Sequence, residues 1–214
     1  MQGILFDLDG TLLDTAKDLN LSLNRVLQSR QLPPLDPVVT RNASGAGCKG
    51  LLKLGLDIDT DHPNYSELAN DLLQYYAEHL LDHTNFFPGM EEVLLALDAK
   101  QIPWGIVTNK PQRFTQPLMQ HFGLDKRARC ILSGDSLKQH KPHPEPLLVA
   151  ANALQIPAAA CWYIGDSEVD VQASKAAGMT MVLAMYGYIT ADDHPAHWGA
   201  DKTIQQPQEI LQFF

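Results

Sequence analysis

Two aspartates separated by one residue stand close to the start of the sequence, where Asp7 and Asp9 follow the apolar run 3–6. Side chains i and i+2 of an extended segment point the same way, so the two carboxylates are expected to converge, and Gly10 allows a sharp turn beyond them. Two like charges about 4 Å apart repel by roughly 4 kcal/mol at an effective dielectric of about 20. The pair therefore predicts an active site with a cation, a shared proton or unlike roles for its two members. The alternative is a structural turn that Asp9 caps.

A second acidic pair, Asp166 and Asp170, follows the apolar run 161–165. The two residues lie on one face if a helix starts between them, because side chains four apart on a helix are neighbours. Together with the first pair they place three or four acidic groups near one cavity, and hard oxygen ligands of this kind suit Mg²⁺. The alternative for Asp170 is a charge at a helix N-terminus that complements the helix dipole.

Further polar residues occur where they could support such a site. Thr108 and Asn109 follow the apolar run 103–107 and offer a hydroxyl and a backbone N–H. Lys141 precedes a proline, which favours extended backbone, and two more prolines nearby stiffen its loop. Taken singly, a threonine at a strand end and a lysine in a polar loop are ordinary structural residues. Beside the acidic pairs they could supply donors to an anionic ligand.

Alternating strands and helices are predicted to position these residues. From residue 85 onward, short apolar runs alternate with segments of helical spacing, which is typical of parallel strands joined by helical crossovers. Ligands bind such sheets outside the carboxyl ends of the strands, where Asp7, Thr108 and Asp166 fall. The predicted fold class is α/β, with a doubly wound, Rossmann-like parallel sheet. Besides the first run, the predicted strands are 103–108, 129–133, 161–165 and 179–184, and the predicted helices are 91–100, 112–122, 145–154 and 168–177.

The segment 15–84 interrupts this alternation, because it carries helical stripes without strand-like runs. One stripe runs from Leu19 to Leu27 and another from Leu68 to Leu80, and prolines break the chain after the first. We therefore expect an α/β core domain made of residues 1–14 and 85–214, with a helical cap domain of residues 15–84 inserted into it. An insertion at this place would act as a lid over the strand ends.

The composition limits the classes of partner. The 214 residues are 45% hydrophobic, enough for a buried core, and the formal net charge is −9. No run of lysine and arginine offers a footprint for nucleic acid or an anionic membrane, so neither is expected. Three scattered cysteines and no apolar stretch long enough to span a bilayer favour a cytoplasmic protein. We expect a small-molecule partner and a monomer or homodimer.

Four motifs in this order resemble the haloacid dehalogenase-like hydrolase superfamily over essentially the whole chain. They are Asp7-Leu8-Asp9-Gly10-Thr11, Val107-Thr108-Asn109-Lys110, Lys141-Pro142-His143-Pro144 and Gly165-Asp166-Ser167-Glu168-Val169-Asp170. The resemblance implies that Asp7 is the nucleophile of a phosphatase, forming an aspartyl phosphate, and that Asp9 is its general acid and base. It further implies that Lys141, Thr108 and the N–H of Asn109 bind the phosphoryl oxygens.

The resemblance also implies the metal ligands. The family pattern makes Asp7, the backbone carbonyl of Asp9, and Asp166 ligands of Mg²⁺, with Asp170 assisting through Ser167 or water. The insertion after the first motif resembles the helical cap class, which includes phosphoglycolate phosphatases and beta-phosphoglucomutases. The expected reaction is therefore the Mg²⁺-dependent hydrolysis of a small phosphate monoester.

Substrate recognition is expected from the segment 41–49, which combines glycines with the charges of Arg41 and Lys49 and predicts a flexible loop between helices. In capped relatives the corresponding segment touches the leaving group, so Arg41 and Lys49 are candidates to bind a substrate carboxylate. The alternative is surface charge on a hinge.

The resemblance leaves two substrates open. The segments 108–111, 141–144 and 186–188 look like phosphoglycolate phosphatases. The segments 104–107, 186–189 and 197–201 are similar to the N-acetylmuramic acid 6-phosphate phosphatases of bacterial cell-wall recycling, which we favour slightly. Both substrates carry a carboxylate near a phosphate monoester. A sugar phosphomutase of the same superfamily and, from another class, a non-catalytic phosphate-binding regulator are the alternative functions.

Overall fold

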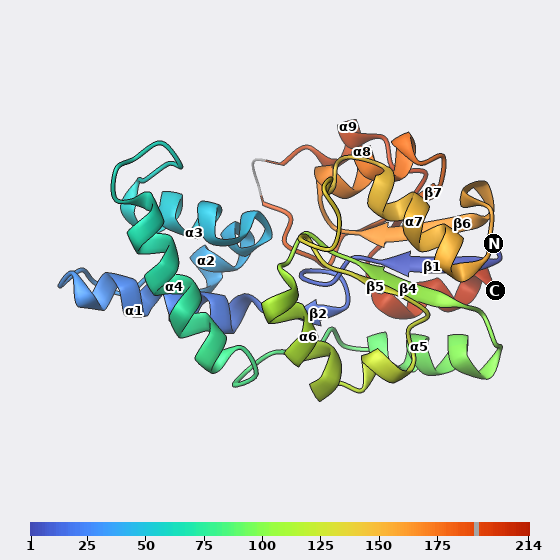
Figure 1. Ribbon diagram of the computed structural model, residues 1–214, viewed down its shortest axis with the longest axis horizontal. Coiled ribbons are helices and arrows are strands. Elements are labelled where there is room, and N and C mark those ends of the chain that lie inside the picture. The colour runs from blue at the N-terminus through green and yellow to red at the C-terminus, as the bar shows by residue number, and fades with distance from the viewer. Residues whose placement is uncertain (191–192) are drawn as a thin grey trace. The chain divides into compact units, whose positions relative to one another are not determined.

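The computed structural model describes residues 1–190 and 193–214, which form two compact units (Figure 1). The first, here called the core unit, consists of Met1–Leu13 and Phe86–Phe214, and the second, the helical unit, of Asp14–Asn85. The chain therefore leaves the core unit after its first strand and returns to it about 70 residues later.

A parallel sheet forms the centre of the core unit. In the described part of the chain it has six strands in the order β5-β4-β1-β6-β7-β8, and every neighbouring pair is parallel. The strands are β1 (Gly3–Phe6), β4 (Trp104–Val107), β5 (Ile131–Leu132), β6 (Cys161–Gly165), β7 (Thr180–Ala184) and β8 (Lys202–Ile204). The central strands are apolar along their whole length because helices cover both faces of the sheet. The predicted α/β class is confirmed.

The helices of the core unit lie on both faces of this sheet. Figure 1 shows α7 and α8 on one side and α5 on the other. The helices are α5 (Met90–Ala99), α6 (Gln112–His121), α7 (Glu145–Leu154), α8 (Glu168–Ala176) and α9 (Pro195–Trp198), with 3-10 turns at Leu124–Lys126, Ala158–Ala160 and Pro207–Phe213. The predicted helices agree to within one residue at each end. The prediction did not include β8, because its Lys-Thr-Ile sequence has no apolar run.

The helical unit packs four helices on one another, α1 (Ala16–Ser29), α2 (Pro37–Ala43), α3 (Gly47–Leu56) and α4 (Tyr65–His79). Both predicted stripes are buried, since Leu23 and Leu72 are fully inaccessible to solvent. The carboxylate of Asp18, itself buried, accepts hydrogen bonds from the backbone of His83 and from the backbone and hydroxyl of Thr84. These bonds fasten the end of the unit to the start of its first helix.

The segment of the helical unit predicted as a flexible loop is helical. Arg41 lies in α2 and Lys49 in α3, with a single 3-10 turn at Ser44–Ala46 between them. Helix α2 forms because the Asp36 side chain caps its N-terminus and a proline occupies the first helical position, where a missing N–H costs nothing. The glycines that suggested a loop mark the short turn between two helices.

The two short strands β2 (Leu13–Asp14) and β3 (Asn85–Phe86) pair in a separate sheet where the chain leaves and re-enters the core unit. Among the described residues, no helix combines the length and the apolar character needed to cross a membrane.

Candidate active site

Three of the predicted site residues directly follow neighbouring strands. Asp7 follows β1, Thr108 follows β4 and Asp166 follows β6, and β1 lies between β4 and β6 in the sheet. The backbone N–H of Asp7 donates to the carbonyl of Ile164 at 2.8 Å, which continues the pairing of β1 with β6 to the site. The carboxyl ends of parallel strands meet at one edge, so the sheet itself brings these residues together.

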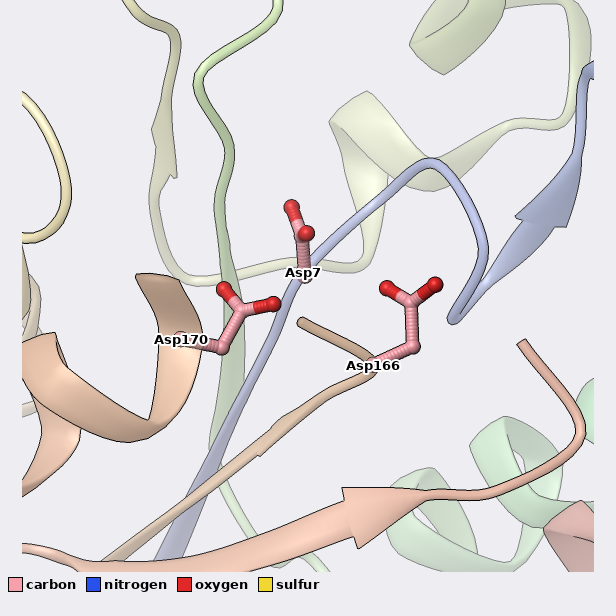
Figure 2. A group of neighbouring side chains, drawn as sticks. All are labelled: Asp7, Asp166 and Asp170. Carbon is pink, nitrogen blue, oxygen red and sulfur yellow. The ribbon is translucent and has the colours of Figure 1, made fainter. Parts of the chain in front are cut away.

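Three buried carboxylates meet at this edge. Asp7, Asp166 and Asp170 each offer an oxygen within 4.8 Å of the others, and Figure 2 shows the three side chains next to one another. Burial, followed by the charge of Asp170, raises the pKa of Asp7 to about 7 against the opposing effect of Lys141. Burial and the charges of Asp170 and Asp7 raise the pKa of Asp166 well above its usual value.

Lys141 supplies the positive charge next to this group. Its ammonium lies 2.9 Å from Asp7 Oδ1 and 2.7 Å from Asp170 Oδ1, and it donates to the hydroxyl of Tyr163 at 2.8 Å. Burial opposes the charged ammonium, but Asp170 and Asp7 outweigh it and raise the pKa of Lys141 to about 12. The Asn109 side chain holds the backbone of Lys141 from both sides, accepting from its N–H at 3.0 Å and donating to its carbonyl at 2.9 Å.

Asp170 is bonded at both carboxylate oxygens, by four polar groups of the site. Oδ1 is bonded by Lys141 and Tyr163, and Oδ2 accepts from the backbone N–H and hydroxyl of Ser167 in a capping box at the start of α8. Burial opposes its ionisation, but Lys141 and the hydrogen bonds of Ser167 and Tyr163 lower its pKa. Asp170 therefore combines the cap of the alternative interpretation with a place in the acidic group.

Asp166 lies in a cradle built from two glycines. A Cβ added to Gly10 or to Gly187 would collide with the Asp166 side chain, and one at Gly187 would also lie 2.6 Å from the carbonyl of Gly10. The Thr11 hydroxyl donates to Asp166 Oδ1 at 3.2 Å, and the backbone N–H of Tyr188 donates to Oδ2 at 2.8 Å. The carboxylate is thus fixed in direction before any ligand binds.

The donor set fits a divalent cation with oxygen ligands. Three buried carboxyl groups lie within 4.8 Å of one another, and the Lys141 ammonium contacts two of them, Asp7 and Asp170. Four polar groups bond the Asp170 oxygens, one of them the Lys141 ammonium, whereas Asp166 accepts from the neutral donors of Thr11 and Tyr188. Asp7 and Asp166 are therefore the carboxylates that we expect to ligate such an ion directly.

Asp9 does not join this group of carboxylates. Strand β1 ends at Phe6, so the alternation of an extended strand no longer orients both aspartates toward one point. The Asp9 carboxylate is bonded by Lys110, whose ammonium lies 2.9 Å from Oδ1 and 3.2 Å from Oδ2. The backbone N–H of Lys110 donates in turn to the Thr108 hydroxyl oxygen at 3.1 Å. The two members of the pair therefore have different partners.

The remaining candidates, Arg41 and Lys49, belong to the helical unit. Arg41 forms an ion pair with Asp14 at 2.6 Å, and Lys49 is exposed on α3. Their assignment to the substrate stays a prediction.

Three residues of the site received no role from the sequence. Lys110 was visible as a lysine directly after Thr108 and Asn109, but its partner lies 101 residues away. Tyr163 lies in an apolar strand and has the pattern of a core residue, and Gly187 occurs in a short Tyr-Gly-Tyr sequence with no chemical signal of its own. The contacts of these three residues join segments far apart in the sequence, so local sequence patterns do not reveal them.

The sequence matches the family model described as haloacid dehalogenase-like hydrolase over residues 4–184. The chain belongs to the haloacid dehalogenase-like hydrolase family. This match confirms the resemblance found in the four motifs, and it includes all four of them.

Relatives within the family are phosphatases. The N-acetylmuramic acid 6-phosphate phosphatase of Pseudomonas aeruginosa is 36% identical over 211 residues, which cover 99% of this chain and 93% of the relative. A phosphoglycolate phosphatase of Xanthomonas campestris pv. campestris is 37% identical over 209 residues, 98% of this chain and 94% of the relative. The crystal structure of a predicted phosphoglycolate phosphatase from Haemophilus somnus matches with a TM-score of 0.86 at 29% identity, covering 100% and 97% of the two chains. The chain is accordingly a phosphatase of this hydrolase family.

Proposed function

We propose that this phosphatase hydrolyses a small phosphate monoester in a Mg²⁺-dependent reaction that passes through an aspartyl phosphate on Asp7. The observation that carries the proposal is the position of Asp7 at the end of β1, 2.9 Å from the buried ammonium of Lys141 and in the same group as Asp166. A nucleophilic carboxylate requires a cation that neutralises it and the incoming phosphate, and Lys141 is fixed for this role.

The chain's own residues divide the reaction into two steps. An oxygen of Asp7 attacks the phosphorus, the bond to the leaving oxygen breaks, and Asp9 gives that oxygen a proton. Asp9 then takes a proton from a water molecule, which attacks the phosphorus and releases Asp7. In both steps Lys141 stabilises the charge of the phosphoryl oxygens, and the Thr108 hydroxyl and the N–H of Asn109 donate to them.

Asp7, Asp166 and the backbone carbonyl of Asp9 would hold the Mg²⁺ ion, with Asp170 acting through Ser167 or water. When bound, the ion supplies positive charge to the phosphoryl oxygens and to the crowded carboxylates. Its support is the group of three buried carboxyl groups, whose oxygens lie within 4.8 Å of one another.

The substrates we propose are N-acetylmuramic acid 6-phosphate and phosphoglycolate, with a slight preference for the first. Support comes from the relatives that bear these names, at 36% and 37% identity. In both compounds a carboxylate accompanies the phosphate, and we propose that Arg41 and Lys49 of the helical cap bind it. For Arg41 this requires exchange of its present partner, Asp14.

The experiment measures phosphate release with Mg²⁺ from these two compounds and from a panel of sugar phosphates. We expect kcat/KM to be highest for one of the two carboxylate-bearing substrates. Asp7→Asn should lower kcat by about 10⁴-fold or more, as loss of a nucleophile does in other covalent enzymes. Asp125→Asn, which removes an exposed carboxylate of the core unit, is the matched control and should have full activity.

Absence of phosphate release from the whole panel, or full activity of Asp7→Asn, would refute the proposal. Activity that appears only with a sugar bisphosphate primer would show the phosphomutase alternative, and phosphate binding without turnover would show the regulator.

A further inference from the structure

The ion pair between Lys110 and Asp9 is built into the edge of the site. The Lys110 ammonium bonds both oxygens of the Asp9 carboxylate, at 2.9 and 3.2 Å. The Lys110 side chain is 6% exposed and that of Asp9 is 21% exposed. A charged lysine loses its hydration when it is buried in this way, so a nearly inaccessible ammonium requires a partner fixed in place.

The backbone of Lys110 is fastened at three points. Its N–H donates to the Thr108 hydroxyl at 3.1 Å, and its carbonyl accepts from the N–H of Gly134 at 2.9 Å and from the hydroxyl of Thr115 at 3.2 Å. A Cβ on Gly134 would collide with the backbone of Asn109, so the two loops lie in close contact. These contacts fix the backbone from which the Lys110 side chain extends, so that its ammonium can hold the Asp9 carboxylate in a defined position.

The two aspartates of the first motif are each bonded by a different lysine. Lys141 lies 2.9 Å from Asp7 and also bonds Asp170, whereas Lys110 bonds Asp9. The Asp9 carboxylate thus has a counter-charge separate from that of the acidic group Asp7, Asp166 and Asp170.

We propose that Lys110 is a positioning residue that holds the Asp9 carboxylate for the second step, the hydrolysis of the aspartyl phosphate. The inference rests on the proposed function. In that step Asp9 takes a proton from water, the water oxygen bonds to phosphorus, and the bond between phosphorus and the Asp7 oxygen breaks with its electron pair returning to Asp7. Inorganic phosphate leaves, and the proton on Asp9 passes to the leaving oxygen of the next turnover.

The test follows both steps separately with p-nitrophenyl phosphate, whose leaving group departs without a proton. In the Lys110→Met variant we expect the initial burst of p-nitrophenol to remain, while the steady-state kcat falls by about 10²-fold, the effect of misplacing a reacting group by about 1 Å. Acid-quenched samples should then contain accumulated phosphoenzyme. Lys110→Arg, which keeps the charge and the hydrogen bonds, should restore most of the steady-state rate.

The matched control is Lys126→Met, which removes an exposed lysine from the same unit and should behave as the wild type. If Lys110→Met fails to fold by thermal melting, Lys110→Gln takes its place. An unchanged kcat, a higher KM with kcat intact, or an equal loss of burst and steady state without phosphoenzyme would each overturn the inference. Wild-type turnover and the inactivity of Asp7→Asn test the proposed function independently of these results.

Discussion

Asp7 and Asp170 contact the buried ammonium of Lys141, and Asp166 lies beside these two carboxylates in the core unit. The three carboxylates respond differently because their partners differ. Asp170 is bonded at both oxygens and its pKa is lowered, whereas burial and like charge raise the pKa of Asp7 and of Asp166. The carboxylates therefore repel one another when they are ionised, and a bound cation would reduce this repulsion.

The raised pKa of Asp7 predicts how the stability of the metal-free protein depends on pH. The pKa of Asp7 rises from 3.8 to about 7 on folding, so between these values the native state keeps a proton that the unfolded chain has lost. Stability contributed by this group is therefore present below about pH 4 and is lost as pH rises toward 7. The melting temperature of the wild type in EDTA should fall across this window relative to that of Asp7→Asn. Parallel curves of melting temperature against pH for the two proteins would contradict the raised pKa of Asp7.

Gly187 makes a second residue-scale prediction. Gly187→Ala would push a methyl group against Asp166 and the carbonyl of Gly10, and so turn the carboxylate from its direction. We expect the Mg²⁺ concentration for half-maximal activity to rise about 10- to 100-fold, as when supporting contacts of a metal ligand are lost. Titration of activity with Mg²⁺ measures this.

The control is Gly178→Ala, because Gly178 has a φ of 69° and an added Cβ would have no atom of the described residues within 4 Å. This variant should lower the melting temperature through backbone strain and leave the Mg²⁺ requirement unchanged. An unchanged requirement in Gly187→Ala as well would show that the cradle does not orient Asp166.

At the scale of elements, the loop after β4 organises both lysines of the site. Its Asn109 side chain clamps the backbone of Lys141, and the next residue, Lys110, bonds Asp9. This short loop therefore positions two lysines that bond different carboxylates. Side-chain to backbone hydrogen bonds join it directly to the loop that carries Lys141.

Asn109→Ala tests this coupling of loops. The variant keeps the backbone N–H that we assign to the phosphate, and loses the two hydrogen bonds to Lys141, at a cost of about 1–3 kcal/mol in the free energy of unfolding. We expect kcat to fall about 10-fold, because the ammonium loses its fixed base. Denaturant titration and steady-state kinetics measure the two effects. Asn152→Ala, at an exposed position on α7, is the control, and equal behaviour of the two variants would refute the role of Asn109.

The elements were largely predictable from the sequence for a physical reason. Buried parallel strands such as β4 and β6 are continuous apolar runs, and a polar residue directly after each run marks the edge of the sheet. Thr108 and Asp166 could be located in this way. The segment 41–49 was predicted as a loop from its glycines, but it belongs to two helices, the first of which is capped by the Asp36 side chain.

The contacts within the site were less predictable. Lys110 and Asp9 are 101 residues apart, and the hydroxyl of Tyr163 reaches Asp170 from a strand whose pattern is that of core packing. Periodicity locates an element and its buried face, but a side-chain pairing depends on how two loops approach each other. The sequence therefore predicted the strands and helices, whereas the partners of Asp9 and Asp170 became known only from the structure.

At the scale of the whole molecule, the chain builds the core unit from two separate segments, Met1–Leu13 and Phe86–Phe214. The first segment supplies Asp7 and Asp9, and the second supplies Lys110, Lys141 and the other two aspartates of the group. The site therefore forms only when β1 has paired with its neighbours β4 and β6 in the core sheet. In the proposed function, catalysis belongs to this unit and the choice of substrate to the helical unit.

The most direct measurement of the central claim is the chemical identification of the phosphorylated residue. The enzyme is mixed with Mg²⁺ and a phosphomonoester, quenched in acid within one turnover, and reduced with borohydride, which converts an aspartyl phosphate to homoserine. Peptide mass spectrometry should find homoserine at position 7, only after incubation with substrate, and in greater amount in Lys110→Met. Modification at Asp9 or another residue, or none in an enzyme that turns over its substrate, would contradict the account.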